Sequence, residues 1–190
     1  MFYSSIGLAI SVDGGQTFQK YSKAPIIQRN DVDPWCVLLP SVLFEKGLWR
    51  MWYVSGLGWD QQSNYTQSLY HICYAESGDG INWRREGDVC IGLSEGETNT
   101  AHPCVIRDGG IYKMWYSYEA GRGYRIGYAE SSNGLEWGRM DHLAGITISN
   151  APYENEMVCQ PHVFSHKGKR YMFYNGNQFG RDGIALGVEE

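Results

Sequence analysis

The sequence predicts an all-β fold, and three observations lead to that prediction. Aromatic residues make up 14% of the 190 residues, and 24 residues are glycine. Aromatic side chains favour the half-buried surfaces of β-sheets, whereas glycine supplies the positive φ angles of tight turns. A hairpin pattern recurs three times along the chain, and no segment has the apolar periodicity of a long helix. We therefore expect short antiparallel strands joined by tight turns.

The repeated hairpin begins at a proline and ends in an aromatic cluster. Its three copies span residues 40–53, 103–116 and 161–174, and in each copy a methionine stands eleven residues after the proline. A short apolar strand precedes a polar, glycine-containing turn, and the second strand then carries Met-Trp-Tyr or Met-Phe-Tyr. Chance would not preserve this spacing three times, so the copies are predicted to be equivalent elements of one repeating architecture. The aromatic residue after each methionine is expected to pack between repeats.

A second hairpin follows the first one along the chain. Its leading strand reads Ile-Cys-Tyr-Ala-Glu-Ser at 72–77 and Ile-Gly-Tyr-Ala-Glu-Ser at 126–131, and a related strand at 6–11 opens the chain. The turns that follow are Asp-Gly-Gly at 13–15, Asp-Gly at 79–80 and Asn-Gly at 133–134. Such dipeptides between apolar strands are strong hairpin signals, because they accept positive φ angles.

Two hairpins together form a unit of four antiparallel strands in roughly 55 to 65 residues, which is typical of a β-propeller blade. We predict about three blades of a five-bladed ring. Fewer than four blades would leave edges uncovered, so we expect an N-terminally truncated fragment that lacks about 110 residues. The predicted parts are a half blade at 1–28, complete blades at 34–94 and 97–149, and an incomplete blade at 155–190.

Composition and charge exclude several classes of protein. The formal net charge is −5, whereas nucleic-acid-binding proteins carry clustered basic residues. No apolar stretch is long enough to span a membrane, and Met1–Ser5 lacks the pattern of a signal peptide. The five cysteines are widely separated without metal-binding spacing, which favours free thiols in the cytoplasm. We predict neither a metal ion nor a cofactor.

The repeats resemble those of five-bladed propellers in the glycoside hydrolase families that include arabinanases, xylosidases, invertases and β-mannoside phosphorylases. The resemblance rests on the proline-led strand, the Met-aromatic-Tyr strand, and the Tyr-Ala-Glu-Ser strand ahead of Asp-Gly-Ile-Asn-Trp at 79–83. It covers essentially the whole chain and is closest to uncharacterised bacterial members that are described as glycosyl-hydrolase-like. Turn and core residues carry these motifs, so they are more specific for the fold than for the chemistry.

The resemblance implies a glycosidic substrate in the central channel, with one carboxylate as general acid and another as the base that activates water in a hydrolase, whereas in a phosphorylase phosphate takes the place of water. The candidates are the acids that lead into the three inner strands, Asp33, Glu97 and Glu156. In the related hydrolases the general acid stands two residues before the inner-strand proline, at positions that are Leu38, Ala101 and Cys159 here. None of these side chains is a useful proton donor, so either a shifted loop supplies the acid or this fragment alone is inactive.

Candidates for sugar recognition lie in predicted loops or next to the inner-strand prolines. Trp35, and Trp59 in an expected loop from Gly56 to Gln67, could stack on the apolar face of a sugar ring. The polar candidates for binding hydroxyl groups are His102, His162, Asn175 and Asn177. The competing interpretation is a structural role for the two histidines and a role in the turn for the two asparagines.

Two other interpretations of function stay open at the level of sequence. A non-catalytic propeller would use its acids only to recognise glycan hydroxyls or a protein partner. An inactive fragment of a larger enzyme would explain why no proton donor precedes the inner-strand prolines. In each case we expect a carbohydrate ligand and neither a nucleic acid nor a membrane as a partner. A homo-oligomer is the alternative means of covering exposed blade edges.

Overall fold

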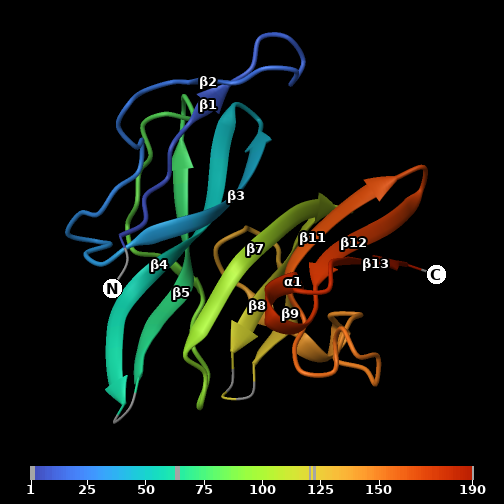
Figure 1. The fold of residues 1–190 in the computed structure, drawn as a ribbon. Helices are drawn as coiled ribbons and strands as arrows, with labels where there is room; N and C mark the ends of the chain where they lie inside the picture. Colours follow the sequence, from blue (N-terminus) through green and yellow to red (C-terminus); the bar gives the residue numbers. More distant parts are fainter. Residues whose placement is uncertain (1–2, 63–64, 120, 122, 190) are drawn as a thin grey trace.

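The computed structural model describes residues 3–62, 65–119, 121 and 123–189, and this part of the chain is almost entirely β-structure, as predicted (Figure 1). Its helical elements are a 3₁₀ turn, Asp141–Leu143, and the short α1, Asn177–Gly180, neither of which has the length and hydropathy to cross a membrane. The strands are β1 (Ala9–Ile10), β2 (Gln19–Lys20), β3 (Val37–Glu45), β4 (Leu48–Gln62), β5 (Tyr65–Ser77), β6 (Val89–Ile91), β7 (Asn99–Asp108), β8 (Ile111–Glu119), β9 (Tyr124–Ser131), β10 (Gly138–Arg139), β11 (Cys159–His166), β12 (Lys169–Asn175) and β13 (Ile184–Val188).

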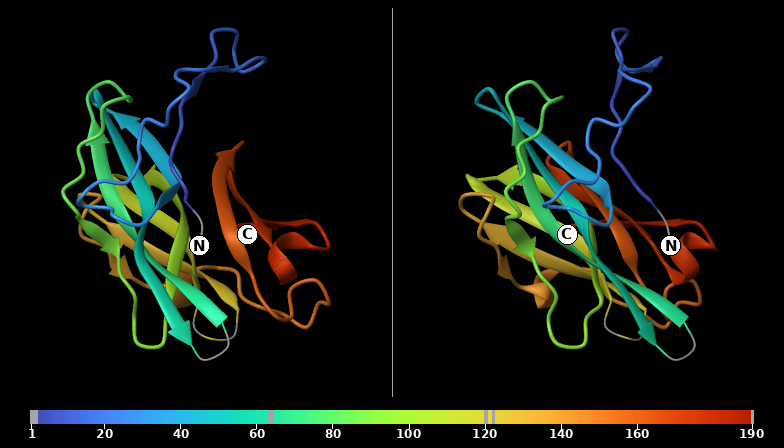
Figure 2. Two further views of the ribbon diagram at one scale, coloured as in Figure 1. Left: turned by 60° about the vertical axis from the view of Figure 1, so that its left-hand side comes forward. Right: turned by 90° about the vertical axis from the view of Figure 1, so that its left-hand side faces the viewer.

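Consecutive antiparallel strands form the repeating units of the fold. Strands β3 to β6 pair in chain order, as do β7 to β10, while β11, β12 and β13 form a separate sheet. We call these the first, second and third units. A parallel bridge between Tyr70 and Asn99 links β5 to β7. The short β1–β2 hairpin projects from one end of the molecule (Figure 2).

The strand registers show that the three proline-led hairpins are equivalent. The repeat methionine faces a valine in each hairpin: Val42–Met51, Val105–Met114 and Val163–Met172. Each hairpin also has a register shift beside its proline, where the preceding residue has a φ of 54° at Leu39, 50° at His102 and 56° at Gln160. Positive φ is uncommon for such residues, and a bulge of this kind re-aims the neighbouring side chains.

Serine side chains hold the turns of the outer hairpins. Ser77 Oγ accepts a hydrogen bond from the Gly80 N–H at 2.9 Å, and Ser131 Oγ accepts one from the Gly134 N–H at 2.8 Å. Gly134 has a φ of +81°, and an added Cβ there would lie 3.1 Å from Trp52 Cζ2. Both the backbone conformation and the close packing therefore require glycine at this position.

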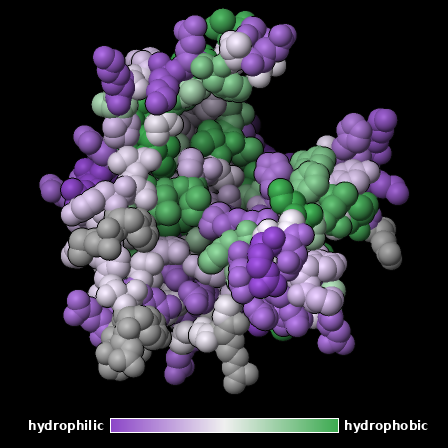
Figure 3. Space-filling view, viewed as in Figure 1, coloured by the Kyte–Doolittle hydropathy of each residue, from purple (hydrophilic) through white to green (hydrophobic). Residues whose placement is uncertain are grey.

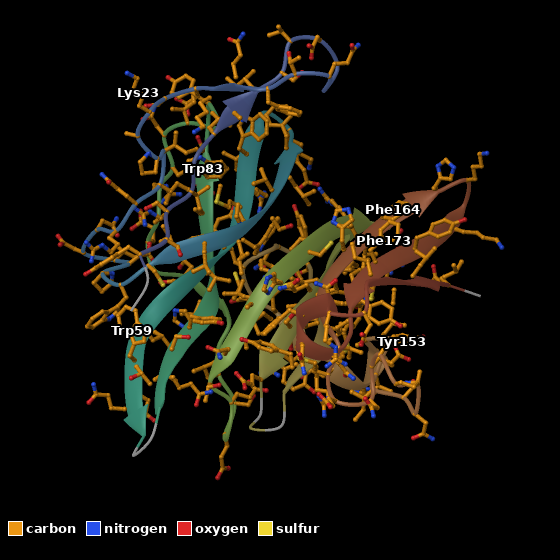
Figure 4. The ribbon with its side chains drawn as sticks, viewed as in Figure 1. Lys23, Trp59, Trp83, Tyr153, Phe164 and Phe173 are labelled. Carbon is orange, nitrogen blue, oxygen red and sulfur yellow. The ribbon has the colours of Figure 1, made fainter. Side chains whose placement is uncertain are left out.

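In the first two units, the aromatic residue after the repeat methionine packs against the next unit. Trp52 and Trp115 are buried, and their Nε1 groups donate to the carbonyls of Gly134 at 2.8 Å and Ala144 at 3.3 Å. Trp115 also packs in one core cluster with Val163 and Met172 of the third unit, so the two tryptophans hold successive units together. In the third unit the expected packing is not found, because the equivalent Phe173 is exposed, next to Phe164 on a sheet face that none of the described segments covers (Figure 4).

Met51 and Tyr74 in the first unit are 23 residues apart, whereas the equivalent Met114 and Tyr128 in the second unit are 14 apart. This insertion of nine residues extends a hairpin, so the prediction of a loop from Gly56 to Gln67 is wrong. β4 and β5 stay paired beyond a bulge between Gly56 and Gly58, out to the pair Gln62–Tyr65. The inserted residues lengthen both strands, and continued pairing satisfies their backbone N–H and C=O groups. Residues 63 and 64 of the expected loop lie outside the described residues.

The five cysteines are free thiols, as the sequence predicted. Four of them are buried and Cys104 is partly buried. Burial raises the pKa of Cys73, and likewise that of Cys159, to about 12. These protonated thiols act as small apolar side chains in the core.

Candidate functional site

Aromatic side chains link the three units at the ends of their strands. The hydroxyls of Tyr70 in the first unit and Tyr124 in the second lie 2.9 Å apart. The Tyr124 ring in turn meets the Phe179 ring of α1, with a centroid separation of 5.8 Å. The first strands of the three units are β3, β7 and β11. Because neighbouring strands are antiparallel, the starts of β5 and β9 and the segment after β12 lie at the same end of their units as the starts of these first strands. One end of the molecule therefore carries a row of rings.

Trp35 and Trp59 extend this row in the first unit. Their ring centroids are 5.2 Å apart, with an edge-to-face angle of 82°. Gly56 pairs with Tyr70 across β4 and β5, and a Cβ added at Gly56 would lie 3.2 Å from Trp35 Cβ. The backbone of Gly56 thus connects the tryptophan pair to Tyr70. We call the following five residues the aromatic rim: Trp35, Trp59, Tyr70, Tyr124 and Phe179.

The structure brings both predicted sugar-stacking tryptophans together, although they come from different kinds of segment. Trp35 lies in the loop before β3, as expected, and is partly exposed. Trp59 lies in strand β4 opposite Ser68, and not in a loop, because the insertion continues the β-ladder (Figure 4). No sequence pattern predicts the contact between the two rings.

A cavity of about 310 Å³ opens beside Trp35. Its polar lining includes Asp33, Ser55 and His71. Burial lowers the pKa of His71, so its imidazole is neutral at pH 7 and has one donor and one acceptor nitrogen. An aromatic wall beside a few polar groups is the composition of a small-ligand site.

Asp33 is buried at the edge of this cavity and is fully engaged by protein groups. Its Oδ2 accepts hydrogen bonds from Arg85 Nη1 at 2.5 Å and from the Tyr53 hydroxyl at 3.0 Å. Burial and the Asp33 charge raise the pKa of Tyr53, which therefore stays protonated as a donor. Arg85 and Tyr53 thus hold the Asp33 carboxylate in a buried ion pair.

Glu97 is held in a second ion pair, in the second unit. Arg139 makes two parallel hydrogen bonds to its carboxylate, of 2.7 and 2.8 Å, and the Ser94 N–H donates a third at 2.8 Å. Arg139 also binds Asp141 at 2.8 Å, and Asp141 accepts from the Tyr116 hydroxyl at 2.5 Å. This network ties the segment before β7 to the end of β10.

Glu156 differs from the other two acids because its side chain is exposed. Its backbone N–H donates to Asn177 Oδ1 at 2.9 Å, and its carbonyl accepts from Arg125 Nη1 at 3.0 Å. Among the described residues, Glu156 forms no salt bridge of the kind that neutralises Asp33 and Glu97. Different partners thus hold the three candidate acids, and the cavity beside Trp35 is lined by Asp33 but by neither Glu97 nor Glu156.

The two candidate histidines have different environments. His102 occupies the bulge before Pro103, where burial lowers its pKa to about 4. Its Nδ1 is buried and has no hydrogen-bond partner among the described residues. His162 is exposed beside Phe164, with ring centroids 6.1 Å apart. Neither histidine lines the cavity beside Trp35.

The two candidate asparagines are bonded to the protein. Asn175 Nδ2 donates to Gln160 Oε1 across the third unit. Asn177 is buried, and both its amide oxygen and its amide nitrogen make two hydrogen bonds to the segment from Pro152 to Met157. Asn177 therefore serves the local structure, which was one of its two predicted roles.

Sequence reasoning missed Phe179 and the arginines that engage the candidate acids. Glycines at 176 and 180 flank Phe179, and they signal an irregular segment without indicating an exposed ring. Arg85 and Arg139 follow Asp33 and Glu97 by 52 and 42 residues, a separation at which no local pattern predicts a pair. Only the packing of strands brings these charges together.

Two curated relatives match nearly the whole chain, and no family model matches it. The uncharacterized protein MT1551 of Mycobacterium tuberculosis (strain CDC 1551 / Oshkosh) is 38% identical over 189 residues, which are 98% of this chain and 62% of the relative. Uncharacterized protein Rv1502 of Mycobacterium tuberculosis (strain ATCC 25618 / H37Rv) is 37% identical over 189 residues, which are likewise 98% of this chain and 62% of the relative. The chain thus spans 62% of the length of these relatives.

Several solved structures that share the fold are described as glycoside hydrolases. One glycoside hydrolase aligns with a TM-score of 0.74 at 20% identity, over 97% of this chain and 56% of its own. The structure of a BT0996 complex with RGII aligns with a TM-score of 0.72 at 21% identity, over 91% of this chain and 52% of its own. Zg3597 of Zobellia galactanivorans, a family 117 glycoside hydrolase, aligns with a TM-score of 0.66 at 19% identity, over 85% of this chain and 54% of its own.

Members of two families that the sequence resemblance had implied align as well. A structure from the GH130 family of mannoside phosphorylases has a TM-score of 0.55 at 17% identity, over 73% of this chain and 43% of its own. A GH32 β-fructofuranosidase of Bombyx mori has a TM-score of 0.56 at 13% identity, over 77% of this chain and 32% of its own. At these identities the likeness establishes a propeller-type glycosidase fold and not an activity.

Proposed function

We propose that this chain is part of a glycoside hydrolase-like protein and binds a carbohydrate at the aromatic rim. The observation that carries the proposal is the Trp35–Trp59 pair beside a cavity with polar groups from Ser55 and His71. Sugar rings have an apolar C–H face that packs on aromatic rings, while their hydroxyls bind neutral donors and acceptors. The fold shared with glycoside hydrolases supports the same ligand class.

Hydrolysis of a glycosidic bond is the catalytic form of this proposal, and Glu156 is its candidate residue. A general acid must present its carboxyl group to the glycosidic oxygen of a bound ligand. The ion pairs of Asp33 with Arg85 and of Glu97 with Arg139 occupy both carboxylates, whose side chains are only 1% and 6% exposed. Glu156 has an exposed carboxylate, so it stays available to a bound ligand.

We also propose that the complete protein is a five-bladed ring, of which the three units and the 1–28 segment are a part. The greater length of the mycobacterial relatives supports this proposal. So does the uncovered sheet face of the third unit, because equivalent faces of the other two units are buried. Turnover would then belong to the whole ring, with further carboxylates from the remaining blades.

The test is a binding measurement on the purified chain with carbohydrates linked to its structural neighbours. The probes are RGII oligosaccharides, β-1,2-linked mannooligosaccharides and sucrose. Trp35→Ala is expected to weaken binding about tenfold or more, because the stacking surface is lost, whereas Trp35→Phe retains most of the affinity. Titration calorimetry and tryptophan fluorescence give the dissociation constants.

Two control variants sharpen this experiment. Phe44→Ala removes an exposed ring that packs on Trp49, at the turn joining β3 to β4, and is expected to leave binding unchanged. Glu156→Gln is expected to keep the affinity of the chain for the carbohydrate. In the complete five-bladed protein, the same substitution is expected to abolish any turnover. Binding of none of the three probes by the unmodified chain would contradict the proposal, and unchanged binding by Trp35→Ala would remove the rim from it.

A further inference from the structure

The segment from Gly176 to Arg181 is locked in place by Asn177. Asn177 Oδ1 accepts hydrogen bonds from the backbone N–H groups of Glu156 at 2.9 Å and Met157 at 3.1 Å. Its Nδ2 donates to the Pro152 carbonyl at 2.9 Å and to Asn155 Oδ1 at 2.7 Å. The full hydrogen-bonding capacity of this buried amide is thus used to hold one short segment.

The locked segment displays a phenylalanine in an unfavourable backbone conformation. Gln178 and Phe179 are both left-handed, with φ and ψ of 51° and 45° and of 57° and 36°. Left-handed backbone is disfavoured for residues with a Cβ, and two in succession persist only where the surroundings impose them. The Phe179 side chain is nevertheless 57% exposed, so burial of its ring does not compensate for this conformation. Such strain clusters at functional sites, where it pre-positions a group for a ligand.

The groups around Phe179 suit a sugar ring. Tyr124 contacts the Phe179 ring edge-on, with the centroids 5.8 Å apart, and carries the hydroxyl that bonds Tyr70. Asn177 fastens the same segment to the backbone of Glu156, the exposed candidate acid. The exposed Phe179 ring thus lies beside the Tyr124 ring on a segment that is bonded to the backbone of an exposed acid, an arrangement that suits the C–H face and the hydroxyls of a sugar.

We propose that Phe179 is a second stacking platform for the carbohydrate bound at the aromatic rim, positioned by Asn177. This inference rests on the proposed function and narrows the class of ligand. The Trp35–Trp59 pair belongs to the first unit and Phe179 to the third, with Tyr70 and Tyr124 between them. A ligand that contacts both platforms is an oligosaccharide or a polysaccharide chain and not a single sugar.

The test compares three substitutions of Phe179 with a matched control in the purified chain. Phe179→Ala and Phe179→Gly are expected to weaken binding of RGII or β-1,2-linked mannooligosaccharides about tenfold, and Phe179→Tyr to retain it. Glycine accepts the left-handed conformation, so Phe179→Gly is expected to lose affinity without a lower unfolding temperature. Phe44→Ala is the matched control, because Phe44 and Phe179 are both 57% exposed. This variant is expected to bind the oligosaccharides like the unmodified chain.

The length of the ligand provides a second readout. For Phe179→Ala, the affinity lost is expected to grow with the number of sugars in the probe, whereas Trp35→Ala weakens short and long probes alike. This inference is overturned if Phe179→Ala and Phe179→Gly both bind every oligosaccharide with full affinity. If Trp35→Ala binds weakly in the same experiment, the proposed function remains supported. Binding of no oligosaccharide by the unmodified chain overturns both.

Discussion

The tyrosine that ends each Met-aromatic-Tyr motif anchors a carboxylate. The three hydroxyl–carboxylate pairs are Tyr53–Asp33 at 3.0 Å, Tyr116–Asp141 at 2.5 Å and Tyr174–Glu154 at 2.6 Å. Burial raises the pKa of each of these tyrosines, so each remains a donor. Buried polar groups need such partners, because an unpaired one is costly. Asp33 and Glu154, which lead into β3 and β11, and Asp141, which follows β10, thus have a structural use, independent of any role in catalysis.

His102 is expected to make the stability of the fold depend on pH. Burial lowers its pKa from 6.5 to about 4 in the folded chain, so the unfolded chain binds the proton more readily between these values. The free energy of unfolding should therefore fall as the pH drops from about 6.5 towards 4, by up to about 1.4 kcal/mol per pH unit from this residue. Denaturant titrations across this range measure the effect.

The matched variant for this prediction is His102→Gln, which cannot titrate. Its free energy of unfolding should vary less with pH than that of the unmodified chain, and the two curves should converge in shape above about pH 7. His71 has a pKa lowered in the same direction and contributes equally to both curves. Curves that run parallel from about pH 4 to 7 would show that His102 does not carry the proton linkage.

At the scale of elements, the close approach of one hairpin turn to the neighbouring unit decides the packing. The turn at Asn133-Gly134 covers Trp52, which donates a hydrogen bond to the Gly134 carbonyl at 2.8 Å. Trp137, which closes the same turn, meets the Trp52 ring edge-on at 6.0 Å. The second hairpin of one unit thereby closes the core of the unit before it.

Gly134→Ala is expected to destabilise the fold by about 2–4 kcal/mol, because it combines an unfavourable positive φ with a clash against Trp52. Gly47→Ala provides the control, since Gly47 has the same φ of +81° but no neighbouring atom within 4 Å of an added Cβ. Its cost should be only about 1–2 kcal/mol. Equal losses in urea unfolding would mean that the contact with Trp52 adds nothing.

At the scale of the whole molecule, the sheet of the third unit has an apolar face that lacks a cover among the described residues. Ile184 and Leu186 are 74% and 52% exposed, whereas their counterparts in the second unit, Ile126 and Tyr128, are 3% and 6% exposed. Phe173 pairs with Leu186 on the same sheet. Apolar side chains gather over this unit in the space-filling view (Figure 3). Faces of this kind attract a partner surface.

We expect the chain to self-associate through this face. Sedimentation velocity should detect oligomers whose fraction rises with concentration, because burial of the apolar face favours association. Leu186→Glu should shift the equilibrium to monomer and leave the circular dichroism spectrum unchanged. Val12→Glu is the control, since Val12 is highly exposed but lies far along the chain, in the turn between β1 and β2. A monomer at every concentration would contradict this expectation.

The repeat could be predicted from the sequence because its signals are local. Alternating apolar residues, glycine-containing turns and the eleven-residue spacing from proline to methionine act within a few residues of one another. Those signals alone predict the strands, the turns and the packing position of Trp52 and Trp115. The prediction for the nine-residue insertion was wrong, because its residues are equally compatible with a loop and with a longer hairpin, and pairing across the sheet decides between them.

The partners of the candidate site residues were decided by the tertiary structure. Asp33 meets Arg85, Glu97 meets Arg139, and Trp35 meets Trp59 only because strands from distant segments pack side by side. The exposed position of Phe179 likewise depends on a buried amide that bonds a segment about 20 residues earlier. Backbone propensities act locally, whereas charge pairing and exposure follow from how complete units pack, so the sequence by itself determined the repeat and the tertiary structure determined the site.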